Sequence, residues 1–148
     1  NLIKQIVLNN PQYNFYLIGD KWEQYLGFNE LLRLSNFYYV NEEYSKYPNI
    51  YKKMSYFISV SFNEGGPIPL IETMSCGIYP IVSNTGFAGD VITKENGSVV
   101  DIKNKDVVYE ISNILESASI NRINISESVK KYSWKNFTKK IIKQINFE

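Results

Sequence analysis

The sequence predicts an α/β fold, in which a largely parallel sheet is covered by helices on both faces. One reason is that short apolar runs alternate along the chain with segments whose apolar residues recur at helical spacing. Such alternation is typical of parallel strands joined by crossover helices. Another reason is that a turn rich in glycine and proline joins one strand directly to a helix within residues 56–77. The 148 residues, 44% of them hydrophobic, suffice for one domain with a substantial core.

The elements follow in order from a helix that is already under way at the first residue and ends at Asn9-Asn10-Pro11. Five strands are predicted, over residues 13–18, 37–40, 56–60, 78–82 and 98–100. Helices are predicted over residues 1–9, 22–34, 48–54, 68–76, 106–115, 126–132 and 134–145. Residues 117–125, rich in Asn and Ser, are expected to be an irregular connection, and Val91 and Ile92 a single helical turn.

The stretch from Tyr56 to Gly77 carries the strongest functional signal. An apolar strand is followed by Gly65 and Gly66, then by two prolines that suit the first turn of a helix. Gly77 is expected to end that helix in the left-handed conformation. Free N–H groups at a helix start attract anions, and glycine allows the backbone to approach a phosphate closely.

Two carboxylates bracket this turn. Glu64 precedes the glycines and Glu72 lies within the helix, roughly 10 Å away at 1.5 Å of rise per helical residue. Carboxylates accept hydrogen bonds from hydroxyls, so the pair matches a ligand with a sugar at one end, a diphosphate in the middle and a ribose at the other end. The alternative is that both are ordinary solvated acids, but the strand, glycines and helix start around them favour a site.

Composition excludes several other kinds of chemistry. The chain has no histidine and one cysteine, Cys76, which excludes Ser-His and Cys-His catalysis, histidine metal sites and an internal disulfide. No metal site is predicted. The net charge of +1 gives no field that would recruit nucleic acid. No apolar run is long enough to span a bilayer and no signal-peptide pattern occurs, so a cytoplasmic location is expected.

The segment Glu64-Gly65-Gly66-Pro67, followed four residues later by Glu72, resembles the E-x7-E motif of retaining GT-B glycosyltransferases of the GT4 type. This resemblance implies a Rossmann-like domain that binds a nucleoside-diphosphate sugar, with no cofactor besides that donor. It implies that Glu64 contacts the donor sugar, that Glu72 holds the ribose hydroxyls, and that the amides of Gly65, Gly66 and Ile68 face the phosphates. Pro67 belongs to the same turn but has no N–H to offer.

The resemblance extends over nearly the whole chain, from Leu17-Ile18-Gly19-Asp20 to Tyr132-Ser133-Trp134. Residues 1–148 therefore resemble the C-terminal, donor-binding lobe. Two parts of the family pattern are missing, namely the first strand of that lobe with its basic loop and the N-terminal lobe that holds the acceptor. In the strand order 3-2-1-4-5-6 the missing strand is central, so either another segment completes the sheet or the chain is a fragment, as we expect. Without the acceptor lobe, the 148 residues are predicted not to turn over alone.

A second loop, Thr85-Gly86-Phe87, follows the next strand and is expected near the donor sugar, because carboxyl ends of parallel strands meet at one edge. An ordinary strand-to-helix loop is an equally good interpretation of it. The last helix is amphipathic and basic, with Trp134 and Phe137 on one side and lysines on the other. Packing of its apolar face onto this domain or onto a missing lobe is favoured over contact with an anionic membrane.

Two other functions remain open at this point. One is a nucleotide-binding module that serves assembly and has no catalytic role. The other is half of a nucleotide-sugar epimerase, an architecture related to the GT-B lobe. The nucleotide, the sugar and the acceptor are not predicted by the sequence.

Overall fold

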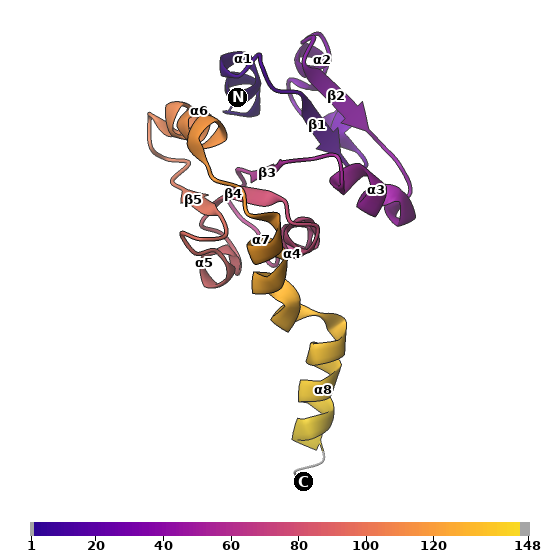
Figure 1. Ribbon diagram of the computed structural model, residues 1–148. Helices are drawn as coiled ribbons and strands as arrows, with labels where there is room; N and C mark the ends of the chain where they lie inside the picture. The colour runs from indigo at the N-terminus through magenta and orange to yellow at the C-terminus, as the bar shows by residue number, and fades with distance from the viewer. Residues whose placement is uncertain (1, 146–148) are drawn as a thin grey trace. The chain divides into compact units, whose positions relative to one another are not determined.

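The computed structural model describes residues 2–145, which form two compact units (Figure 1). Of the described residues, 2–53 and 100–118 belong to the first unit, and 54–99 and 119–145 belong to the second. The two units are described separately below.

The strands are β1 (Phe15–Ile18), β2 (Phe37–Val40), β3 (Tyr56–Ser59), β4 (Tyr79–Ser83) and β5 (Ser98–Val100). The helices are α1 (Leu2–Asn9), α2 (Phe28–Leu31), α3 (Tyr47–Tyr51), α4 (Ile68–Ser75), α5 (Ala88–Val91), α6 (Val107–Ser117), α7 (Arg122–Val129) and α8 (Trp134–Ile145). Short 3₁₀ turns occupy Trp22–Gln24, Tyr44–Lys46 and Lys130–Tyr132.

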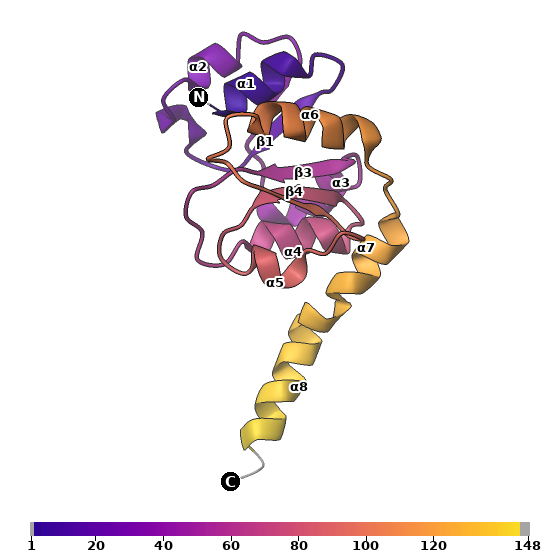
Figure 2. The same ribbon diagram turned by 90° about the vertical axis from the view of Figure 1, so that its left-hand side faces the viewer.

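The first unit is built around the parallel pair β1–β2, in which Phe15 lies opposite Phe37. Val7 of α1, Leu31 of α2 and Phe37 form its buried core. Helix α6 packs against α1, as Figure 2 shows, and the Asn10 amide donates a hydrogen bond to the Ser112 hydroxyl at 2.9 Å. On the surface of this unit, Lys4 pairs with Glu30 and lowers the pKa of that carboxyl through its hydrogen bond and its charge.

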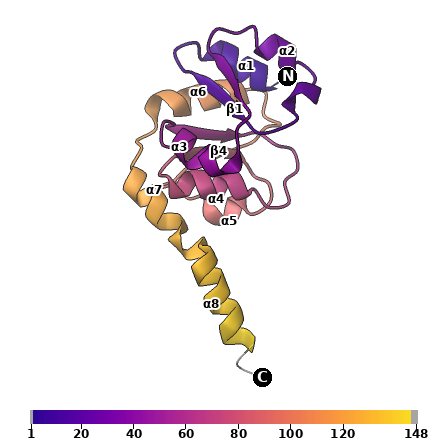
Figure 3. The ribbon, with the colours of Figure 1, turned by 90° about the vertical axis from the view of Figure 1, so that its right-hand side faces the viewer.

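The second unit is built around β3 and β4, which run parallel with Ser59 opposite Val82. All five residues of β4 are buried, so both faces of this strand are covered. Helices α4 and α5 lie along the same side of the pair, and α7 packs against α4 (Figures 2 and 3). Gly77 ends α4 at φ +73°, as expected from the sequence, and a Cβ there would lie 2.7 Å from the Arg122 carbonyl oxygen.

Strand neighbours agree with the predicted α/β architecture. Within the described residues β1 pairs with β2, and β3, β4 and β5 lie side by side in that order. The strands thus form two mostly parallel sheets in place of the single sheet expected.

Four sequence-based assignments need correction. Residues 22–34 do not form one helix. Gly27 adopts a left-handed φ of 98° and separates the short α2 from the 3₁₀ turn Trp22–Gln24, which begins after Lys21 at a left-handed φ of 64°. Residues 122–125, expected to be irregular, begin α7. Helix α5 begins at Ala88, three residues before the expected turn, and helix α3 ends at Tyr51, before the predicted end at residue 54.

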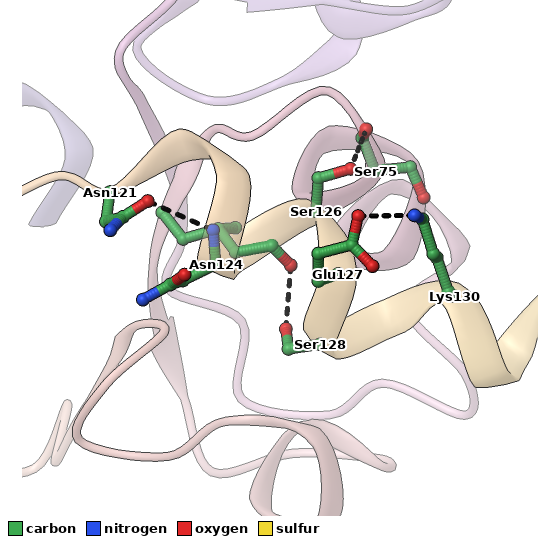
Figure 4. A network of polar contacts seen from close by, with 8 residues as sticks. Ser75, Asn121, Asn124, Ser126, Glu127, Ser128 and Lys130 are labelled. Carbon is green, nitrogen blue, oxygen red and sulfur yellow. Dashed lines mark hydrogen bonds and ion pairs between the residues drawn. The ribbon is translucent and has the colours of Figure 1, made fainter.

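Helix α7 begins earlier than expected because Asn121 caps it. The Asn121 side-chain oxygen accepts a hydrogen bond from the backbone N–H of Asn124 at 3.1 Å (Figure 4). The Ser126 hydroxyl then donates to the Ser75 carbonyl at the end of α4, which joins the two helices. Only Ile125 and Val129 of α7 are buried, so the apolar pattern of this helix is too sparse to predict its start.

We expect Asn121→Ala to lower the free energy of unfolding by about 1 kcal/mol, because the first turn of α7 loses the acceptor for one of its N–H groups. Urea denaturation followed by circular dichroism measures this change. Asn124→Ala is the matched control, since it keeps the backbone N–H that donates to the cap. An equal loss of stability in both variants would show that the cap has no special contribution.

Helix α8 extends away from the rest of its unit (Figures 1 and 3). None of its residues is buried, and its exposed large apolar side chains are Trp134, Phe137, Ile141, Ile142 and Ile145. Within the described residues this apolar face does not pack onto the domain itself, which was one of the two protein surfaces expected for it. None of the helices within residues 2–145 has both the length and the apolar character needed to cross a bilayer.

Candidate functional site

The candidate site lies where β3 and β4 end, within the second unit. Because the two strands are parallel and adjacent, the loop after Ser59 and the loop after Ser83 emerge at the same edge of the sheet. Together the loops line a hollow of about 450 Å³. Its lining residues are Phe62, Asn63, Glu64, Gly65, Asn84, Thr85 and Gly86.

Glu64 presents an exposed carboxylate to this hollow. One of its oxygens, Oε1, accepts a hydrogen bond from the Ser61 hydroxyl at 2.8 Å. Gly65 follows, and nothing lies within 4 Å of the position that a Cβ would occupy there. The first part of the turn is therefore open, with a carboxylate and bare backbone accessible to a ligand.

The start of α4 has fewer free N–H groups than the sequence suggests. Pro67 adopts φ −72° and ψ 78°, close to an inverse γ-turn, and the N–H of Ile68 donates to the Gly66 carbonyl at 2.8 Å. The N–H of Leu70 donates to the Pro67 carbonyl at 3.0 Å. Within the described part of the chain, the N–H groups of Gly65 and Gly66 donate to no carbonyl, so both are available as anion donors.

The second loop packs directly on this turn. Gly86 adopts φ +54°, and a Cβ there would lie 2.9 Å from Pro67 Cδ and 3.0 Å from the Glu64 carbonyl oxygen. The ring of Phe87 lies against Gly66, at 3.3 Å from the position of a Cβ. The N–H of Thr85 donates to the Ser83 carbonyl at 2.8 Å, which keeps this loop tight.

The hollow thus brings together four of the residues predicted from the sequence, namely Glu64, Gly65, Thr85 and Gly86. Gly66, Pro67 and Phe87 are not among the lining residues, but they make contacts between the two loops. Ile68 is exposed at the start of α4, and Glu72 lies in the middle of that helix, half-buried and outside the lining.

Three lining residues were not predicted: Phe62, Asn63 and Asn84. The rule that polar residues after parallel strands meet at one edge could have identified Asn84, which directly follows β4. Within residues 2–145, no group of three or more His, Cys, Asp or Glu side chains is arranged to hold a metal ion.

Comparison with known protein families identifies the family that contains both loops of this site. Residues 1–133 match the family model described as glycosyl transferases group 1. The chain belongs to this family. The family match ends just before α8, so it includes both loops of the hollow and α7.

Two glycosyltransferases are similar to this chain over part of their own length. The O-antigen chain mannosyltransferase B of Escherichia coli is 30% identical over 125 residues, which cover 82% of this chain and 29% of the enzyme. The lipopolysaccharide outer core galactosyltransferase WaaB matches 96% of this chain and 45% of its own, with a TM-score of 0.72 and 19% identity.

A second structural neighbour is Anabaena Alr3699/HepE, solved in complex with UDP and glucose, with a TM-score of 0.75 and 16% identity. It covers 98% of this chain, and the match covers 43% of HepE. These structures show that the chain has the fold of one GT-B glycosyltransferase lobe. The chain spans less than half the length of the proteins that it matches.

Proposed function

We propose that this chain is the donor-binding lobe of a retaining glycosyltransferase, which binds a nucleoside-diphosphate sugar for transfer to an acceptor. One observation carries the proposal. The Glu64 carboxylate and the free N–H groups of Gly65 and Gly66 lie on one turn, at the hollow formed by the loops after β3 and β4. The family match supports transfer of a sugar, and the complex of HepE with UDP and glucose supports the class of donor.

Each part of the proposed site has a chemical role. Glu64 accepts hydrogen bonds from hydroxyls of the donor sugar and orients it. The N–H groups of Gly65 and Gly66 stabilise the negative charge on the departing diphosphate, as an oxyanion hole does in acyl transfer. Glu72 binds the ribose hydroxyls, and Thr85, Gly86 and Phe87 form the wall beside the sugar. Neither a metal ion nor another cofactor is part of this proposal.

The acceptor belongs to a second, N-terminal lobe in this proposal. Two features support a partner lobe: the chain matches less than half of each related enzyme, and the apolar face of α8 is uncovered. We infer that this face packs against the second lobe. The competing occupant is an anionic membrane, which the lysines of α8 would favour. Cosedimentation of the chain with phosphatidylglycerol vesicles tests the membrane, and binding lost in Trp134→Ser would favour it.

Two other functions compete with donor binding for transfer. A module that serves only assembly should bind no nucleotide sugar. A nucleotide-sugar epimerase should convert its donor without any acceptor. Incubating the chain with UDP-, GDP- and ADP-linked hexoses, followed by chromatography of the products, separates an epimerase from the other two candidates. We expect neither epimerisation nor transfer by the 148 residues alone, since the acceptor lobe is not among them.

Calorimetric titration with the same three nucleotide sugars tests donor binding itself. We expect weak binding of one of them by the wild-type chain. Glu72→Ala should then lower the affinity for both that donor and its nucleoside diphosphate by about tenfold, because one or two hydrogen bonds to a charged acceptor are lost. Glu116→Ala, at an exposed position of α6, is the matched control. Absence of binding for all three donors would contradict the proposed function.

A further inference from the structure

A chain of hydrogen bonds connects the core of the second unit to the carboxylate of Glu64. It begins at Ser83, the last residue of β4, which is only 2% exposed. The Ser83 hydroxyl donates to the Ser61 carbonyl at 2.6 Å and lies 3.4 Å from the Ser59 carbonyl. The paired register of β3 and β4 ends at Ser59 and Val82. The Ser83 side chain therefore holds the neighbouring strand just beyond the point where regular pairing stops.

The second step runs from Ser61 to Glu64. The Ser61 backbone is held by Ser83, and its hydroxyl donates to Glu64 Oε1 at 2.8 Å. A glutamate on an exposed loop would otherwise sample several rotamers, and ordering such a side chain costs conformational entropy. The hydroxyl orders the carboxylate in advance. Within the described residues Oε2 accepts no hydrogen bond, which leaves it for a ligand hydroxyl.

We propose that Ser61 and Ser83 are positioning residues, which hold the Glu64 carboxylate in the orientation that receives the donor sugar. This inference rests on the proposed function, because it assigns a sugar to Glu64. Neither serine lines the hollow, so in this inference each acts on the ligand through the Glu64 carboxylate. Their contribution is therefore to the affinity for the sugar, and the affinity for the nucleoside diphosphate should be unaffected.

The test compares two ligands in calorimetry: the nucleotide sugar that the wild-type chain binds best and the matching nucleoside diphosphate. Ser61→Ala should weaken binding of the nucleotide sugar about fivefold to tenfold and leave the diphosphate unchanged. Ser61→Thr keeps a hydroxyl, so its loss of affinity for the nucleotide sugar, on a logarithmic scale, should be at most half that of Ser61→Ala. Ser75→Ala, which removes an exposed hydroxyl that donates to the Ile71 carbonyl on α4, should change neither affinity.

A second arm tests whether Ser83 acts on the same carboxylate. Ser83→Ala should lower the affinity for the nucleotide sugar and leave the affinity for the diphosphate unchanged. Combining Ser83→Ala with Ser61→Ala should cause little further loss of affinity, since both effects pass through Glu64. Thermal melts of each variant identify any that do not fold. If an alanine variant does not fold, the affinity of Ser61→Thr relative to the wild type decides whether the hydroxyl positions Glu64.

The outcomes separate the inference from the proposed function. An equal loss for both ligands would mean that Ser61 only maintains the loop, and no loss at all would mean that Glu64 is positioned without it. Either result overturns the inference while the proposed function stands. If the wild-type chain binds none of the nucleotide sugars, the proposed function fails and the inference fails with it.

Discussion

Replacing Glu64 with alanine should reduce the affinity for the nucleotide sugar about tenfold to a hundredfold and leave the affinity for the nucleoside diphosphate nearly unchanged. The carboxylate is exposed in the hollow and is held by a hydrogen bond at 2.8 Å from Ser61, so its geometry is set before any ligand arrives. Hydrogen bonds to a charged group contribute about 1.5–3 kcal/mol, which corresponds to the predicted factor. Calorimetry with both ligands measures the two affinities.

Two further variants make this prediction specific. Glu64→Gln keeps the shape of the side chain and removes its charge, so its affinity for the nucleotide sugar should fall between those of Glu64→Ala and the wild type. Glu95→Ala removes the same kind of side chain from an exposed position in the same unit, outside the hollow, and should have no effect. If Glu64→Ala lowers the affinity for the diphosphate as much as the affinity for the nucleotide sugar, the carboxylate does not act on the sugar.

The fold could be predicted largely from local signals in the sequence. Strand β2 is short and aromatic, and its predicted bounds of 37–40 are confirmed, as are the left-handed Gly77 and the whole of α8. The errors arise where the local signal is weak. Helix α7 has only two buried apolar residues, and the segment after Lys21 is divided by backbone conformations that its apolar pattern does not reveal.

The candidate site was less predictable, because it depends on contacts between segments about 20 residues apart. The sequence indicates that Glu64 and Thr85 follow strands, but the role of Asn84 in the lining requires the parallel register of β3 and β4. The hydrogen bond from Ile68 to Gly66 depends on the ψ value of Pro67, which proline leaves undetermined. The assignment of Glu64 and Glu72 to sugar and ribose stays a prediction.

Gly86 is the position where a single methyl group should disturb the site most. Its φ of +54° is unfavourable for other residues by about 1–2 kcal/mol, and a Cβ would lie 2.9 Å from Pro67 Cδ and 3.0 Å from the Glu64 carbonyl oxygen. Both contacts are with the turn that carries Glu64, so the two loops must move apart. We expect Gly86→Ala to lower the free energy of unfolding by about 2–3 kcal/mol and to weaken nucleotide-sugar binding as well.

Gly65 provides the matched control, because it lies in the same hollow but has open space around the position of a Cβ and no left-handed φ. Gly65→Ala should change the free energy of unfolding by less than about 0.5 kcal/mol, as is usual for surface positions. Urea denaturation of both variants and the wild type measures the difference. Equal stability of the two variants would mean that the loop after β4 does not pack on the turn at Gly66 and Pro67, and the hollow would then lack its second wall.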